Sequence, residues 1–226
     1  MGIPRTGVQR VSIVLIAAAA WAAARADKAR TFEEDAVGRP PAGFSFHVMR
    51  SAAAARWFVQ REVTNSFLSH APDAGAKEGF ALAVLDGESR SQISLSARIR
   101  LAAGRRSGGI VWRVQDGENY YLARLDLDRQ DLGLYRVVNG NRTRVEGEDD
   151  LDLDPAAWHT LKVVQQAESM RVYLGGISVL RARDRALGKP GSVGLWCAGD
   201  ADAHFDDVRL STPDDREDHE GSRRGR

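Results

Sequence analysis

The sequence predicts an all-β fold in which two antiparallel sheets pack face to face as a sandwich. From Thr31 to Leu210 the chain repeats short runs rich in Val, Ile, Leu, Phe, Tyr and Trp, separated by Gly, Asn or Asp. This alternation of strands and turns is typical of sandwiches and barrels, and helical periodicity is nearly absent. So many strands need two packed sheets to bury their apolar faces.

The apolar runs place the predicted strands in order along the chain. Runs rich in β-branched and aromatic residues favour strands, and in the N-terminal part they lie at 44–48, 57–62, 66–70, 80–84 and 91–102. The middle of the chain continues with strands at 109–115, 120–126, 132–138 and 143–146. The C-terminal part completes the series with strands at 160–165, 170–174, 177–183, 192–197 and 203–210.

Turn residues between these runs predict antiparallel hairpins. Asn139-Gly140 separates two strand-like runs, and Asn-Gly is the strongest short-range signal for a two-residue hairpin turn. "LGGIS" at 174–178 and "DGEN" at 116–119 offer further residues suited to positive φ angles. We therefore expect consecutive strands to pair with one another.

Both ends of the chain differ from this pattern. Residues 1–26 resemble a secretory signal peptide, because Arg5 and Arg10 precede an uncharged run at 11–24 and Ala24-Arg25-Ala26 forms a cleavage pattern. An uncleaved anchor is the alternative, but a membrane span needs about 20 apolar residues. Residues 212–226 lack an apolar pattern and predict a disordered charged tail. The β domain is thus expected at 27–211, and the residue bias suggests a bacterial protein that is periplasmic or secreted.

Charge and cysteine content indicate which ligand class is disfavoured and how the fold is stabilised. Without residues 1–26 the chain has 29 basic and 31 acidic side chains, because the segment contains three arginines and no acid. Proteins that bind nucleic acid usually have a clustered basic surplus, so this class is not indicated. Cys197 is the only cysteine, which excludes an internal disulfide and leaves stability to the hydrophobic core. No later segment has the length and apolar character of a membrane span. Nothing in the sequence indicates an oligomeric state.

Several motifs in the C-terminal half belong to one pattern. They are "GGIVWR" at 108–113, "NYYLARLD" at 119–126, "WHTLKV" at 158–163, "GSVGLW" at 191–196 and "FDDVRL" at 205–210. Together they resemble bacterial concanavalin A-like, laminin-G-type jelly-roll domains, which include the 3-keto-disaccharide hydrolase family. The resemblance covers most of 31–210, implies a jelly-roll sandwich and makes carbohydrate the expected ligand class. Fold alone does not fix function.

Catalytic motifs are weak in this chain. Jelly-roll glycosidases of the laminarinase type have an E-x-D-x-x-E strand, because a retaining mechanism needs two carboxyl groups about 5 Å apart. The acidic cluster "EGEDDLDLD" at 146–154 lacks the final glutamate and lies where a loop is expected. His47, His70 and His204 are isolated in the sequence. No catalytic residue is assigned, and an enzyme is the less favoured interpretation; if the protein is one, a glycoside hydrolase is expected.

A structural calcium ion is one further possibility. Glu34 and Asp35 in "FEED" and Asp206 and Asp207 in "FDDV" would lie near each other if the two ends of the domain pair as neighbouring strands. Ca²⁺ is a hard cation that prefers clustered carboxylate and carbonyl oxygens. The alternative is that these acids stay in water and protect an edge strand. No other cofactor is indicated.

The remaining candidates lie on the predicted sheet surface. Strand alternation separates Tyr120, Leu122 and Arg124 from Tyr121 and Ala123. If Trp112 faces the core, its neighbour Arg113 points outward. Sugars suit a surface that combines aromatic rings with oriented polar groups. The carbohydrate-binding candidates are Arg113, Asn119, Tyr121, Arg124, Tyr135 and Trp196. The alternative is that these side chains form cross-strand pairs that only stabilise the sheet.

Three functions follow from these observations. The favoured one is an exported, lectin-like domain that binds a saccharide or an envelope glycan. The second is a glycoside hydrolase of the 3-keto-disaccharide hydrolase type, whose catalytic positions find no residue-by-residue match in this chain. The third is a laminin-G-like module for protein interaction. A groove lined by Trp and Tyr favours the first function, and buried carboxylates or an Arg–Asp–His cluster in a concave groove favour the second.

Overall fold

The structure is a computed structural model that describes residues 28–49, 56–71 and 79–213. The predicted signal peptide at 1–26 and all but two residues of the predicted tail at 212–226 lie outside the described residues. Among the residues that are described, no helix has the length and apolar character needed to cross a membrane.

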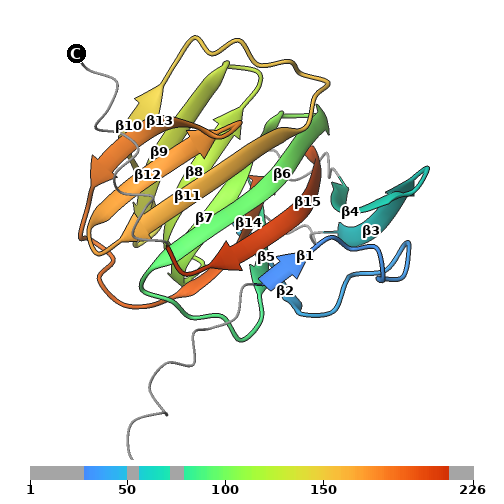
Figure 1. The fold of residues 1–226 in the computed structure, drawn as a ribbon, viewed down its shortest axis with the longest axis horizontal. Coiled ribbons are helices and arrows are strands. Elements are labelled where there is room, and N and C mark those ends of the chain that lie inside the picture. The colour runs from blue at the N-terminus through green and yellow to red at the C-terminus, as the bar shows by residue number, and fades with distance from the viewer. Residues whose placement is uncertain (1–27, 50–55, 72–78, 214–226) are drawn as a thin grey trace, which may run out of the picture.

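Two antiparallel sheets form the molecule, as the sequence predicts (Figure 1). The eight-stranded sheet contains, in spatial order, β13 (Ile177–Arg183), β12 (Ser169–Leu174), β11 (His159–Gln166), β6 (Ile93–Ala103), β15 (Asp202–Ser211), β4 (Asn65–Ala71) and β3 (Arg56–Glu62), with β1 (Lys28–Arg30) paired to β15. The seven-stranded sheet contains β10 (Asn141–Glu148), β9 (Asp131–Val138), β8 (Asn119–Asp126), β7 (Ser107–Asp116), β14 (Ser192–Ala198), β5 (Phe80–Leu85) and β2 (Phe44–Met49).

The turns predicted at Asn139-Gly140 and at 174–178 are confirmed, whereas the turn at 116–119 joins β7 to β8 without a positive φ angle at any of its residues. Asn139 and Gly140 have φ angles of 49° and 72°, and they connect β9 to β10 through the pair Val138 and Asn141. Gly175 and Gly176 have φ angles of 57° and 83° and connect β12 to β13 in the same way. Positive φ at both central residues matches the right-handed twist of the strands, which explains why Asn and Gly occur there.

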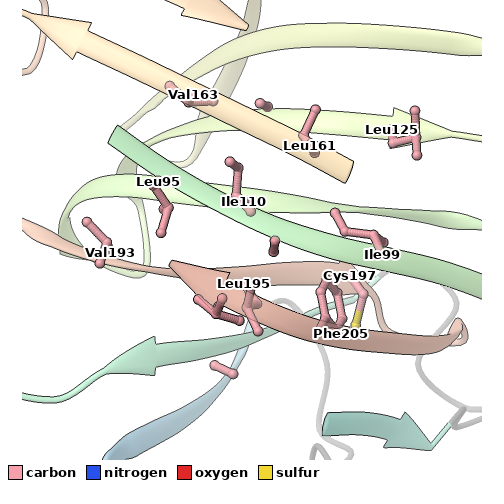
Figure 2. Packing of buried hydrophobic residues seen from close by; sticks show 14 of the residues in the cluster. Leu95, Ile99, Ile110, Leu125, Leu161, Val163, Val193, Leu195, Cys197 and Phe205 are labelled. Carbon is pink, nitrogen blue, oxygen red and sulfur yellow. The ribbon is translucent and has the colours of Figure 1, made fainter. Parts of the chain in front are cut away.

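A single apolar core fills the space between the two sheets. Figure 2 shows side chains from both sheets in this core, including Leu95 and Leu161 from one sheet and Ile110 and Leu195 from the other. Strand alternation is preserved in β14, where Leu195 and Cys197 belong to the core and Trp196 belongs to a separate cluster. Cys197 is a buried free thiol, and burial raises its pKa well above the usual value. It therefore packs as a small apolar side chain.

Candidate functional site

Arg113 lies inside one end of the sandwich, so the prediction that it points outward is wrong. The pairing of β7 with β14 and with β8 shifts register around this residue, and Arg113 has a φ angle of 49°. Such a bulge interrupts the strict alternation on which the prediction depends. The side chain is 6% exposed and donates to Leu187 O at 2.6 Å and to Ser91 O at 2.7 Å.

Tyr121 is also an interior residue and does not line a binding surface. Its ring is fully buried and stacks on Trp112 with 5.6 Å between the ring centroids. The hydroxyl donates to Asp184 Oδ1 at 2.6 Å and accepts the Leu187 N–H at 3.2 Å. Burial and the bond to Asp184 raise the pKa of Tyr121 to about 12. The hydroxyl therefore holds the 184–187 loop against the core.

Asn119 lies at the start of β8 and joins two hairpins. Its Nδ2 donates to Asp116 at 2.9 Å, and its Oδ1 accepts the N–H of Asn139 at 3.0 Å. These bonds occupy both ends of the amide, so the structure gives Asn119 a role in turn geometry. It lines a cavity of about 380 Å³ together with Gln115 and Lys189.

Arg124, Tyr135 and Trp196 come together on the outer face, the face of the seven-stranded sheet turned away from the core. Tyr135 and Trp196 belong to a second apolar cluster, whose members come from β5, β7, β8, β9 and β14: Leu82, Val84, Val111, Tyr120, Leu122, Tyr135, Val137 and Trp196. The guanidinium carbons of Arg124 and Arg142 lie 5.1 and 5.2 Å from the centroid of the Tyr135 ring. Three of the six predicted candidates thus share one face.

The outer face is hollowed by two adjoining cavities. The larger has a volume of about 360 Å³ and is lined by Met49, Tyr120 and Val137 among others. The smaller has a volume of about 160 Å³ and is lined by Arg124, Trp196 and their neighbours. Phe80 and Arg142 line both cavities, and the Arg142 guanidinium lies 5.8 Å from the Phe80 ring centroid. The ring centroids of Phe80 and Trp196 are 5.2 Å apart.

Arg124 joins two buried carboxylates at the edge of this face. Asp126 and Asp131 are paired across β8 and β9, and each is 6% exposed. Arg124 Nη2 donates to both oxygens of Asp131, at 2.8 and 3.0 Å, and lies 3.6 Å from Asp126 Oδ2. The guanidinium lies between the two carboxylates and offsets the repulsion between them. The pair is therefore built as an ion cluster.

Two buried donors in the smaller cavity have no hydrogen-bond partner among the described residues. They are Nε1 of Trp196, which is 2% exposed, and Nε of Arg124, which is 5% exposed. Buried polar groups in native proteins are nearly always hydrogen-bonded to protein, water or ligand. The outer face thus contains unmet hydrogen-bonding capacity in two side chains that line a cavity.

The four predicted calcium ligands do not converge. Asp35 accepts from Arg30 at 2.9 Å, and Glu34 is exposed. Asp206 is buried, and its Oδ2 accepts from Asn65 Nδ2 at 3.2 Å. Asp207 Oδ2 lies 3.3 Å from Arg98 Nη1. Within 28–49, 56–71 and 79–213, no group of three or more His, Cys, Asp or Glu side chains is placed to hold a metal ion. Calcium binding at this edge stays a prediction.

His204 forms a polar cluster on the opposite, eight-stranded sheet, although it looks isolated in the sequence. Its Nδ1 lies 3.1 Å from Arg100 Nε, and its Nε2 lies 3.0 Å from Asp202 Oδ1. Arg100 also donates to Glu62 at 2.7 Å. Because arginine only donates, Nδ1 must accept and the ring proton lies on Nε2. The acceptor nitrogen is occupied, so His204 is not poised as a general base.

We expect His204 to make the protein less stable in mild acid. Burial lowers the pKa of His204 below 6.5, against the opposing effect of Asp202. As the pH falls through about 6.5, the unfolded chain takes up a proton that the folded chain refuses, so acid favours unfolding. Urea unfolding measures the free energy of unfolding at about pH 7.5 and about pH 5.5. Between these two pH values the wild type should lose more of this free energy than His204→Gln does. His47→Gln changes an exposed histidine and should lose as much as the wild type.

Sequence reasoning missed several residues that line the two cavities. Phe80 in β5 meets Trp196 because β5 pairs with β14. Arg142 comes from β10 at the other end of the strand order and reaches Phe80 across the outer face. Tyr120 was detectable, because it shares strand parity with Leu122 and Arg124. Met49, Arg105 and Arg129 also line the cavities, and nothing in the local sequence marks them.

Comparison with known proteins identifies the fold. No family model matches the chain, and no curated protein matches it. Similar solved structures include the carbohydrate-binding module CBM66 from Bacillus subtilis, 20% identical with a TM-score of 0.57, over 74% of this chain and 95% of that one. The Bacillus licheniformis β-glucanase is 14% identical with a TM-score of 0.56, over 83% and 98% of the two chains.

A third similar structure was solved with a sugar. Domain 4 of the extracellular arabinanase AbnA from Geobacillus stearothermophilus, in complex with arabinotriose, is 10% identical with a TM-score of 0.51, over 74% and 82% of the two chains. At identities this low, similarity of structure speaks for the fold and not for shared chemistry. The chain therefore has the jelly-roll sandwich fold that is also found in a carbohydrate-binding module and a glucanase.

Proposed function

We propose that the protein is an exported, lectin-like domain that binds a saccharide or an envelope glycan on the outer face of the seven-stranded sheet. One observation supports this most directly: aromatic side chains gather there around two adjoining cavities that arginines border. Sugar rings present apolar C–H faces to aromatic side chains, and their hydroxyl groups need oriented polar partners. The outer face supplies both within one concave surface, which is the usual form of a small-ligand site.

The similar structures support the same ligand class. One is named as a carbohydrate-binding module and another was solved with arabinotriose. Export is proposed from residues 1–26, whose sequence resembles a signal peptide. The ligand site needs no cofactor in this proposal.

Hydrolysis of a 3-keto-disaccharide is the main alternative. Arg100, Asp202 and His204 form the kind of polar cluster expected for it, and they line a further cavity of about 630 Å³ on the eight-stranded sheet. Asp126 and Asp131 are held by Arg124, and the acceptor nitrogen of His204 is held by Arg100. In both arrangements an arginine occupies the groups that a hydrolase would need for proton transfer, which favours binding over hydrolysis. A laminin-G-like protein interaction would use a flat apolar patch, whereas the outer face is hollowed.

A glycan-array screen of residues 27–226, followed by calorimetry on the best ligand, tests the proposal. We expect Phe80→Ala to weaken binding by about tenfold, because an aromatic contact contributes about 0.5–1.5 kcal/mol and tenfold corresponds to about 1.4 kcal/mol. Phe80 lines both cavities and is only partly buried, so the variant should still fold. Ile177→Ala removes an exposed apolar side chain from the other sheet and should bind like the wild type.

Two results would overturn the proposal. The first is an absence of binding to every arrayed glycan, combined with turnover of a 3-keto-glucoside. The second is equal binding by the wild type and Phe80→Ala, because the ligand would then lie elsewhere on the molecule.

A further inference from the structure

The smaller cavity on the outer face has hydrogen-bond donors in excess of its acceptors. Trp196 Nε1 and Arg124 Nε are buried donors without a partner among the described residues. Both side chains line the cavity. Indole and guanidinium groups donate and never accept. A ligand in the cavity that reaches these N–H groups can satisfy them only with acceptor atoms.

The acceptors at the same cavity are already engaged. Asp126 accepts the main-chain N–H of Arg129 through Oδ1 at 3.1 Å, and its Oδ2 lies 3.6 Å from Arg124. Asp128 accepts from Arg106 twice, from the main-chain N–H at 2.9 Å and from Nε at 2.7 Å. The protons of a ligand's own hydroxyl groups would have to compete with these bonds.

The side chains that line the smaller cavity carry more positive than negative charge. The described lining contains four arginines and two aspartates: Arg105, Arg124, Arg129, Arg142, Asp126 and Asp128. Arg105 is paired with Asp200 at 3.1 Å, outside the lining set. Arg129 is exposed, and no ion pair is recorded for its side chain in the described part of the chain. The cavity thus keeps a positive balance at its rim.

From these observations we propose that the ligand is an acidic saccharide, whose carboxylate or sulfate group occupies the smaller cavity. This inference rests on the proposed carbohydrate-binding function. A hydroxyl group brings a proton with its acceptor oxygen, and the two carboxylates of the lining that could accept this proton already accept other hydrogen bonds. An anionic group brings acceptor oxygens alone, and its hydrogen bonds with cationic donors are shorter and stronger than neutral ones. The larger cavity, lined by Tyr120, Val137 and Phe80, is then left for the adjoining sugar ring.

Matched ligands that differ only in charge test the inference. Calorimetry would compare trisaccharides of galacturonate, glucuronate and mannuronate with their methyl esters, and a sulfated trisaccharide with its desulfated form. We expect at least one acidic form to bind about tenfold or more tightly than its neutral form at low salt. The preference should shrink as salt is added, because ions screen the contribution of the exposed Arg129. If only the uronates bind more tightly than their methyl esters, the group in the smaller cavity is a carboxylate. If only the sulfated trisaccharide binds more tightly than its desulfated form, the group is a sulfate.

Two variants locate the effect. Trp196→Phe keeps an aromatic ring and removes the unpaired N–H, so it should reduce the preference for the acidic form to about threefold or less. Trp57→Phe is the matched control, because Trp57 Nε1 also lacks a partner among the described residues but lies in the core between the sheets. It should keep the full preference. Arg129→Gln changes an exposed side chain and should reduce the salt dependence, even if Trp196→Phe folds poorly.

The outcomes separate this inference from the proposed function. Tight binding of neutral sugars with no preference for acidic forms would overturn the acidic ligand and retain carbohydrate binding. An equal loss of preference in Trp196→Phe and Trp57→Phe would also overturn it, because the cavity would then have no special part. Binding to no saccharide of any kind would overturn both proposals.

Discussion

Replacing Arg113 by methionine is expected to lower the free energy of unfolding by about 2–6 kcal/mol. The side chain donates to Leu187 O and Ser91 O and contacts Gln165 Oε1 at 3.1 Å. Methionine fills similar space but donates nothing, so the two main-chain carbonyls lose this donor. A buried polar group left unsatisfied costs about 1–3 kcal/mol. Burial lowers the pKa of Arg113 from its usual value, and the fixed hydrogen bonds offset this cost of desolvation.

Urea unfolding of the mature chain measures the effect of the Arg113 substitution. Arg181→Met makes the same chemical change at an exposed position in β13 and should change the free energy of unfolding by no more than about 0.5 kcal/mol. Arg113→Lys keeps the charge but loses the planar fork that reaches several acceptors, so it should remain clearly destabilised. If Arg113→Met unfolds like Arg181→Met, Arg113 does not hold the end of the sandwich.

The fold is predictable from the sequence because strands and turns are local signals. Alternating apolar residues mark each strand interior, and the Asn139-Gly140 and Gly175-Gly176 turns fix two hairpins by their φ angles. Strand β1 was not predicted, because Lys28–Arg30 has no apolar alternation. It becomes a strand only by pairing with Val208–Leu210 of β15, which is a distant contact.

The candidate site is only partly predictable, because it depends on bulges and on contacts between distant strands. Alternation correctly groups Tyr120, Leu122 and Arg124 on one face of β8. The same rule fails at Arg113, where one bulge turns the side chain into the interior. No local pattern indicates that Phe80 packs on Trp196, because β5 and β14 become neighbours only in the folded sheet. A sequence therefore predicts which residues share a strand face better than which strands share a site.

Arg124→Met is expected to lower the free energy of unfolding at neutral pH by about 3–5 kcal/mol, as is typical when one partner of a buried ion pair is removed. Asp126 and Asp131 face each other across β8 and β9, and both are buried. Without the guanidinium, two like charges would be held together in a medium that screens them poorly. Urea unfolding at about pH 7 measures the loss.

Two further variants separate charge from packing at Arg124, whose guanidinium also lies 5.1 Å from the centroid of the Tyr135 ring. Adding Asp131→Asn to Arg124→Met removes one charge with little change in shape, so it should restore part of the stability at neutral pH. Arg136→Met breaks a more exposed ion pair with Asp184 and should cost about 1 kcal/mol or less. If Asp131→Asn restores no stability to Arg124→Met, Arg124 acts by packing on Tyr135. The carboxylates would then tolerate each other without it, and an ion cluster would no longer describe this edge of the outer face.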